Sequence, residues 1–157
     1  MSHHVPCDEC RYCLEGNHTS CETLHTGNFD PGGFSEFVRV PKINVDSGTL
    51  LLPDNVSYEE GTFVEPLACV IRAHRIINTK KIHRVLVLGS GISGLLNIMY
   101  AKHLGAEVFA TDIDRDCCKT LELNKGKCVS ESAKIYHGDI RDIADSELPQ
   151  NVDLVVG

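Results

Sequence analysis

Four cysteines near the N-terminus have the spacing of a metal site. Cys7, Cys10, Cys13 and Cys21 follow the pattern C-x2-C-x2-C-x7-C. Four thiolates on one tight loop suit the closed tetrahedral site of a structural zinc ion, which leaves no position open for chemistry. An iron–sulfur cluster is an alternative, but its fourth cysteine would fall at position 17, which is Asn17. Incidental thiols or disulfides are a further alternative, and the spacing favours zinc.

A glycine-rich turn is the second chemical pattern. Residues 89–94 read G-x-G-x-x-G between an apolar run and a helical one, and Asp112 lies 18 residues beyond Gly94, at the end of the next apolar run. In that context, the turn and the helix start bind a pyrophosphate through backbone N–H groups. Asp112 would hold the ribose hydroxyls and repel a 2′-phosphate, which predicts NAD rather than NADP. The alternative is a glycine turn that serves packing alone. The predicted cofactor-binding residues are Gly89, Ser90, Gly91, Ile92, Ser93, Gly94 and Asp112.

The predicted helices and strands that position these residues follow different patterns before and after residue 80. Before it, period-two alternation over 34–40 predicts a half-buried strand, and a short extended piece ends at Pro53. Ser57 and Glu60 read as a capping box that opens a helix, and Pro66 predicts a fresh helix over 67–78. After it, strands alternate with helices, which implies a parallel α/β sheet. Strands are predicted at 84–88, 107–112, 134–136 and 152–156, and helices at 92–104 and 115–123. On the helix over 92–104, the stripe expected to face the core is formed by Ile92, Leu95, Leu96, Met99 and His103.

Composition limits the partners of this chain. Its 157 residues are 42% apolar and 24% charged, the mix of a soluble globular protein. No apolar run approaches a membrane span and no signal peptide precedes the cysteines, so a cytoplasmic location without membrane contact is expected. Fifteen basic against 22 acidic residues give a net charge of −7, which disfavours general nucleic-acid binding. The other cysteines lack ligand spacing and are interpreted as small buried residues or idle thiols: Cys69, Cys117, Cys118 and Cys128.

Together, the motifs resemble the zinc-dependent medium-chain alcohol dehydrogenase family, including its polyol and threonine dehydrogenases. The motifs are HHVPC with the four-cysteine lobe, GGFSEF at 32–37, VEPLAC at 64–69 and the glycine loop. The resemblance implies that residues 1–80 are the C-terminal part of a β-rich GroES-like catalytic domain with a zinc lobe. It implies that residues 81–157 are the N-terminal half of a Rossmann NAD-binding domain. The implied reaction is the reversible oxidation of an alcohol or polyol, with hydride passed to NAD.

Glu65 gains a role through this resemblance. In polyol-dehydrogenase-like members, the Glu of the E-P-L motif faces the catalytic zinc, which makes Glu65 a candidate catalytic and metal-binding residue. The alternative is a carboxylate at a helix start, where the helix dipole favours it. The family's other catalytic-zinc ligands lie upstream of the cysteine lobe, and no histidine near the N-terminus matches them. Because a catalytic zinc needs three protein ligands, the isolated chain is expected not to oxidise alcohols. The histidines interpreted as surface or lobe residues are His3, His4, His18 and His25.

From about residue 107, the chain also resembles DNA cytosine-5 methyltransferases. The segments that carry this resemblance are ATDID at 110–114, TLELN at 120–124, GDI at 138–140 and DLVVG at 153–157. It implies that Asp112 would hold the ribose of S-adenosylmethionine instead of NAD. A zinc-stabilised module without catalysis is a third hypothesis. In the dehydrogenase family, the dinucleotide-binding sheet has six strands in the order 3-2-1-4-5-6. The four strands predicted here would leave an open sheet edge, which favours self-association.

Overall fold

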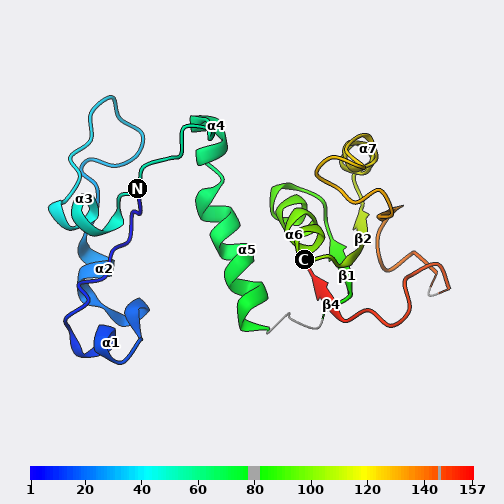
Figure 1. Cartoon of the computed structure of the whole chain (residues 1–157), viewed down its shortest axis with the longest axis horizontal. Coiled ribbons are helices and arrows are strands. Elements are labelled where there is room, and N and C mark those ends of the chain that lie inside the picture. The colour runs from blue at the N-terminus through cyan, green and yellow to red at the C-terminus, as the bar shows by residue number, and fades with distance from the viewer. Residues whose placement is uncertain (78–81, 145) are drawn as a thin grey trace. The chain divides into compact units, whose positions relative to one another are not determined.

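The computed structural model describes residues 1–77, 82–144 and 146–157 and divides the chain into two compact units (Figure 1). The first unit is Met1–Ser57 and the second is Tyr58–Gly157. The domain boundary expected near residue 80 lies outside the described residues. No helix of the described residues is both long and apolar enough to cross a membrane.

The first unit is built from short helices around a very small core. The helices are α1 (Arg11–Leu14), the 3-10 helix η1 (His18–Ser20), α2 (Glu22–Thr26) and α3 (Lys42–Gly48). Buried Asn44 ties α3 to the N-terminus, since its Nδ2 donates to the carbonyl oxygens of Ser2 at 3.1 Å and His3 at 2.8 Å. Among the described residues of this unit, the buried apolar side chains are Val5, Cys13 and Cys21. Hydrophobic burial therefore contributes little here, and the cysteines are the centre of the unit.

The strand predicted over 34–40 is wrong. Phe34 and Phe37 are fully or largely exposed, and the described part of the segment forms an isolated antiparallel bridge between Asp30 and Arg39. The extended piece before Pro53 is likewise irregular, with Leu50 and Leu51 exposed. A strand needs a neighbour that exchanges backbone hydrogen bonds along its length, and the described residues of this unit supply only the single pair between Asp30 and Arg39. The expected β-rich character of residues 1–80 is corrected accordingly.

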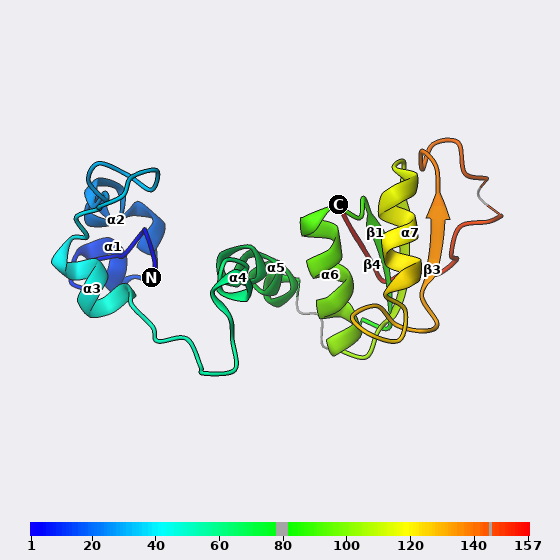
Figure 2. The same ribbon diagram turned by 90° about the horizontal axis from the view of Figure 1, so that it is seen from above.

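The second unit contains a four-stranded parallel sheet in the order β3-β2-β1-β4. The strands are β1 (Arg84–Leu88), β2 (Glu107–Asp112), β3 (Lys134–His137) and β4 (Leu154–Val156), and each overlaps a predicted strand. Helix α6 (Ile92–His103) packs on β1 and β2, and α7 (Arg115–Leu123) packs on β2 and β3 (Figure 2). This is the predicted α/β alternation, and the strand order is the expected one.

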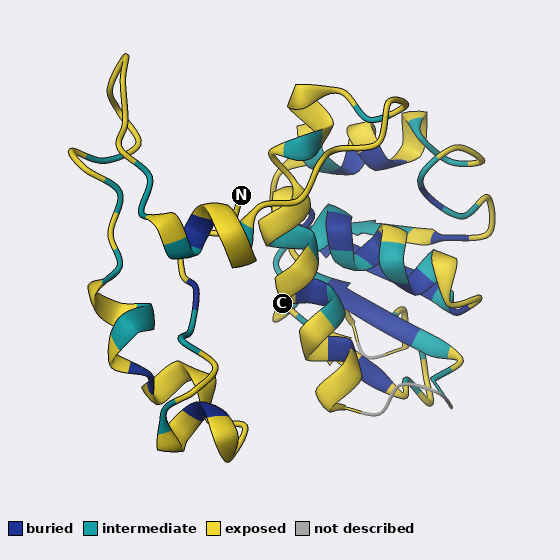
Figure 3. Ribbon diagram, turned by 60° about the vertical axis from the view of Figure 1, so that its left-hand side comes forward, coloured by how far each residue is buried: buried dark blue, intermediate teal, exposed yellow. Residues whose placement is uncertain are grey.

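The sheet is buried where its apolar runs predict. Val85, Val87, Val108 and Ala110 on β1 and β2 are almost wholly buried, and the central strands accordingly appear dark in Figure 3. The core face of α6 differs from the predicted stripe, because Leu96, Ile98 and Ala101 are buried while Ile92 and Met99 are exposed. The predicted stripe is wrong because α6 packs against two neighbours, the sheet and the preceding helix, so its buried residues do not lie along one stripe.

Two further helices precede the sheet. Helix α4 (Tyr58–Gly61) starts directly after Ser57, as the capping-box pattern predicts. Helix α5 (Val64–Ile76) starts earlier than expected, so that Pro66 lies in its first turn. Proline is tolerated there because the first N–H groups of a helix have no intrahelical partner. Residue 78, the predicted end of this helix, lies outside the described residues. Helix α5 packs on α6.

A single carboxylate pins the start of β4 to the start of β1. The Asp153 carboxylate accepts hydrogen bonds from the backbone N–H groups of His83 at 2.8 Å and Arg84 at 2.9 Å. These two bonds lower the pKa of the Asp153 carboxyl below its ordinary value. We expect Asp153→Ala to destabilise the second unit at neutral pH, because two strand-end donors then lose their acceptor.

The stabilising effect of Asp153 depends on pH in a defined direction. A carboxyl whose pKa is lower in the folded state stabilises the fold above its unfolded pKa and loses that effect as the pH falls through the folded pKa. The difference in urea midpoint between the wild type and Asp153→Ala should therefore be largest at pH 7 and shrink below about pH 4. Asp142→Ala, which removes a separate exposed carboxylate, is the control. A midpoint difference that stays constant into acid would contradict this role.

Candidate functional site

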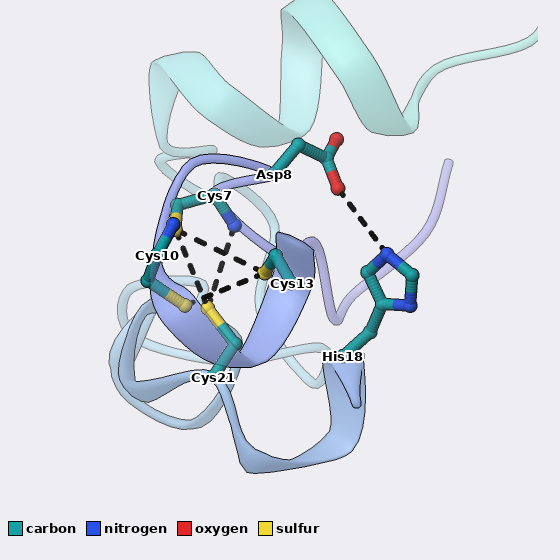
Figure 4. Close-up of polar contacts among 6 residues, drawn as sticks. All are labelled: Cys7, Asp8, Cys10, Cys13, His18 and Cys21. Atoms are coloured by element: carbon teal, nitrogen blue, oxygen red, sulfur yellow. Dashed lines mark hydrogen bonds and ion pairs between the residues drawn. The ribbon is translucent and has the colours of Figure 1, made fainter. Parts of the chain in front are cut away.

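The four predicted metal ligands converge in the first unit. The Sγ atoms of Cys7, Cys10, Cys13 and Cys21 all lie within 4.8 Å of one another. Figure 4 shows the four side chains gathered around one point. The Sγ–Sγ distances are 3.5 Å for Cys10–Cys13, 3.7 Å for Cys21–Cys7 and 4.0 Å for Cys7–Cys13. Thiolates about 2.3 Å from a zinc ion at tetrahedral angles are about 3.8 Å apart, so the sulfur positions fit zinc. Among the described residues, this is the one group of three or more ligand-type side chains arranged to hold a metal.

The surroundings of the sulfurs favour metal over oxidation to disulfides. All four cysteines are free thiols. Backbone N–H groups point at two of them, from Cys7 to the Cys21 sulfur at 3.4 Å and from Cys10 to the Cys7 sulfur at 3.3 Å. Such donors stabilise negative sulfur, and the bond from Cys7 lowers the pKa of the Cys21 thiol to about 6. Burial instead raises the pKa of the Cys13 thiol to about 12, so the pKa values of Cys13 and Cys21 shift in opposite directions.

The histidines near the cluster do not join it. His18 forms an ion pair with Asp8 at 3.7 Å, to the side of the sulfurs (Figure 4). The rings of His4 and His25 hydrogen-bond the backbone oxygens of Leu24 and Thr19, and His3 contacts the His4 ring. All four histidines are exposed, as predicted for surface or lobe residues.

The glycine loop connects β1 to α6 at the carboxyl edge of the sheet. Gly89 has φ +87, a left-handed conformation that favours glycine, and its N–H donates to the Thr111 carbonyl at 2.8 Å. A Cβ on Gly94 would overlap the Gly89 carbonyl oxygen and lie 2.8 Å from its carbon, so the helix crosses the turn with no room for a side chain. A Cβ on Gly91 would meet nothing within 4 Å. The three glycines thus have three different environments: a left-handed turn at Gly89, open space at Gly91 and close packing at Gly94.

Asp112 lies directly against this loop. One carboxylate oxygen accepts from the backbone N–H of Ser90 at 2.5 Å, and the other accepts from the N–H of Asp114 at 2.8 Å. Both Ser90 and Asp112 are buried. The structure therefore brings together the loop and the predicted ribose-binding acid. It also gives Asp112 a second task that the sequence spacing does not reveal, since its carboxylate holds the turn in place.

Glu65 lies elsewhere in the second unit, in the first turn of α5. It is exposed, and its carboxylate accepts from the Cys69 thiol at 3.2 Å one turn later. This bond is the main reason why the pKa of the Cys69 thiol is raised. Both residues line a cavity of about 700 Å³ together with Ser93, Asn97 and Val156. Among the described residues, Glu65 belongs to no set of three metal ligands.

Sequence reasoning missed two side chains around this cavity. Cys69, interpreted as an idle thiol, faces Glu65, and Asn97 donates its Nδ2 to the Ser93 carbonyl at 3.0 Å. Asn97 could have been found from its position, because it lies one helical turn after Ser93 of the glycine loop. Of the other three cysteines, Cys118 is buried and Cys117 and Cys128 are half-buried.

Comparisons with known proteins agree with this arrangement. A sequence model of the family described as alanine dehydrogenase/PNT, C-terminal domain, matches residues 72–157. An uncharacterized zinc-type alcohol dehydrogenase-like protein of Escherichia coli K12 is 34% identical over 113 residues, which are 69% of this chain and 31% of that protein. The L-threonine 3-dehydrogenase of Legionella pneumophila is 30% identical over 145 residues, 90% of this chain and 40% of the enzyme.

A solved structure extends the similarity to both units. The crystal structure of a putative zinc-binding dehydrogenase from Sinorhizobium meliloti, bound to NADP, aligns with a TM-score of 0.68 at 25% identity and covers 97% of this chain and 44% of that chain. The chain thus spans about a third of the length of the curated relatives it matches first.

These matches do not support the methyltransferase hypothesis. Alignments that cover 90% and 97% of the chain must include most of residues 107–157, and both lead to dehydrogenases. Residues 72–157 therefore belong to the alanine dehydrogenase/PNT, C-terminal domain family, and the chain is a member of the zinc-type medium-chain alcohol dehydrogenases.

Proposed function

We propose that this chain supplies the structural-zinc lobe and the nucleotide-binding edge of an NAD-dependent dehydrogenase that oxidises a small alcohol or polyol. The observation that carries the proposal is the contact between Asp112 and the glycine loop, at the carboxyl edge of a parallel sheet. In open parallel sheets, ligands bind at this edge, where the strand order reverses between β1 and β4.

The residues around the loop have separate tasks in this proposal. The open space at Gly91 admits a pyrophosphate, and the free N–H groups at the start of α6 donate to it. Asp112 accepts hydrogen bonds from the ribose hydroxyls while it keeps its bond from Ser90. When bound, the nicotinamide ring supplies the hydride acceptor. Ser90, Ile92 and Ser93 complete the proposed set.

We expect the Asp112 charge to select NADH over NADPH. The carboxylate would repel a 2′-phosphate, although the S. meliloti neighbour is bound to NADP. Asp112→Asn keeps an oxygen that can accept from Ser90 but removes the charge. The wild type should bind NADH at least about tenfold more tightly than NADPH, and the variant should lose most of that preference. Fluorescence titration of both dinucleotides measures this.

The controls of this titration separate the hypotheses. Asp114→Asn removes a neighbouring charge that caps α7 and should retain the preference. Equal affinity of the wild type for both dinucleotides would contradict the assigned role of Asp112. If neither dinucleotide binds while the protein still contains one zinc per chain, the hypothesis of a non-catalytic zinc module is favoured instead.

Glu65 is proposed to face the catalytic zinc in the intact active site. Its support is its exposed position on the wall of the cavity that also contains Ser93 of the glycine loop. A zinc ion there would polarise the alcohol oxygen and lower its pKa. Glu65 alone cannot hold the ion, since three protein ligands are needed. Residues 1–80 would then be the C-terminal part of the catalytic domain and residues 81–157 the first half of the nucleotide-binding domain.

Self-association and location belong to the same proposal. Strand β4 is the last strand in the order, so one of its edges is unpaired within the described sheet and can pair with a second copy. Sedimentation should therefore show species larger than 17.3 kDa. A monomer at every concentration tested would contradict this.

A cytoplasmic location is supported by the eight free cysteines, because a reducing compartment keeps thiols available for zinc.

A further inference from the structure

A buried histidine joins helix α5 to helix α6. His74 is 1% exposed, and its Nε2 lies 3.1 Å from the Oδ1 of Asn97. Its Nδ1 is buried and has no hydrogen-bond partner in the part of the chain that the structure describes. The Tyr100 ring meets the imidazole edge-on at a centroid distance of 5.0 Å. A buried polar ring with one hydrogen bond is costly to keep, so that one bond requires an explanation.

The neighbours of Asn97 fix the direction of this bond. The Asn97 Nδ2 lies 3.0 Å from the Ser93 carbonyl oxygen. A carbonyl can only accept, so the amide nitrogen points toward Ser93 and the amide oxygen points toward His74. The His74 ring must then carry its hydrogen on Nε2 and donate it to Asn97. The buried Nδ1 is left with a bare lone pair, which agrees with its lack of a partner.

The far end of this chain of hydrogen bonds is the proposed dinucleotide site. Ser93 belongs to the glycine loop, and both Ser93 and Asn97 line the 700 Å³ cavity opposite Glu65 and Cys69 of α5. The series His74–Asn97–Ser93 thus connects the wall that contains Glu65 to the first turn of α6, whose N–H groups face the loop.

We propose that His74 is a positioning residue for the dinucleotide site, which acts by holding the Asn97 amide in one orientation against Ser93. The proposal rests on the proposed function, because the ligand it serves is the dinucleotide. His74 does not itself line the cavity, and it contacts the lining through its hydrogen bond to Asn97, so its effect passes through that residue. No local pattern predicts this link, since the two residues are 23 positions apart.

Two variants of His74 separate the hydrogen bond from simple packing. His74→Phe keeps a buried ring and removes the donor, and we expect NADH affinity to fall about fivefold, the effect of one lost hydrogen bond. His74→Gln retains an N–H donor and should recover most of the affinity. His103→Phe changes an exposed histidine that also stacks on Tyr100, and this variant should bind NADH like the wild type. Urea midpoints recorded in parallel show how far each variant is destabilised.

Asn97→Ala provides a second, independent test. Asn97 is only half-buried, so this variant tests the link even if a His74 variant fails to fold. Alone, it should lower NADH affinity about as much as His74→Phe does. In the double variant, His74→Phe should cause no further loss, because the group through which it acts is gone. Additive losses, or NADH affinity unchanged in Asn97→Ala, would overturn the proposal.

A separate measurement distinguishes this proposal from the proposed function. If the wild-type chain fails to bind NADH, the proposed function is wrong, and amide hydrogen exchange over residues 92–97 still tests the link. Exchange there should be faster in His74→Phe and Asn97→Ala and restored in His74→Gln. Exchange that is the same in all of these proteins would overturn the role of His74.

Discussion

Replacement of Gly94 by Ala should destabilise the second unit severely and abolish NADH binding. The added methyl group would overlap the Gly89 carbonyl oxygen, and neither group is at the end of a flexible side chain. Backbone has to move, so the cost is expected to be at least about 3 kcal/mol, a large share of the stability of an ordinary domain. Urea unfolding followed by circular dichroism measures the loss.

The matched variant Gly91→Ala should behave differently. Nothing lies within 4 Å of a Cβ at Gly91, and its φ of −65 suits any residue, so stability should change by no more than about 1 kcal/mol. The methyl group would instead occupy the approach proposed for the pyrophosphate, and NADH affinity should fall at least about tenfold. Gly33→Ala, with open space in the first unit, should alter neither quantity. If Gly94→Ala is as stable as the wild type, the close packing of loop and helix described here is wrong.

Replacement of Cys13 by Ser should release zinc and unfold the first unit. Zinc sites of this kind contribute about 10–16 kcal/mol of apparent binding free energy in small peptides. The first unit has little else to hold it, since Val5 is its one buried aliphatic side chain among the described residues. We expect one zinc per chain in the wild type and none in Cys13→Ser after dialysis. Metal analysis and the loss of helical circular dichroism measure the two effects.

Two controls accompany the zinc experiment. Cys69→Ser changes an exposed cysteine of the second unit and should retain one zinc per chain. Removal of the metal from the wild type with a strong chelator should reproduce the spectrum of Cys13→Ser. Retention of zinc by Cys13→Ser, or iron with acid-labile sulfide in the wild-type protein, would exclude the four-thiolate zinc site.

The sheet and its helices could be predicted because their signals are local. Three elements can each be recognised from a few consecutive residues: the apolar run at 84–88, the helix that ends before Gly105 and the helix over 115–123. The turn between β1 and α6 was predicted for the same reason, since its glycines are required by the backbone itself. Likewise, the cysteine spacing was enough to predict that these four thiols lie together, without any knowledge of the fold.

Features that depend on a distant partner could not be predicted. Alternation over 34–40 shows which side chains would be buried if a neighbouring strand were present, but it cannot supply that strand. The buried face of α6 is divided between the sheet and α5, so a single helical stripe was the wrong model for it. The bond from Ser90 to Asp112 and the bond from His74 to Asn97 join residues more than 20 positions apart, which spacing alone does not show.

The proposed function requires the backbone N–H groups of the glycine loop to hold the pyrophosphate of a dinucleotide. Titration of ¹⁵N-labelled protein with NADH tests it most directly, with each backbone amide followed by nuclear magnetic resonance. We expect the largest shifts at residues 90–95, with smaller ones at Asp112. NADH binding that leaves the amides of 90–95 unchanged, or no binding at millimolar NADH, would contradict it.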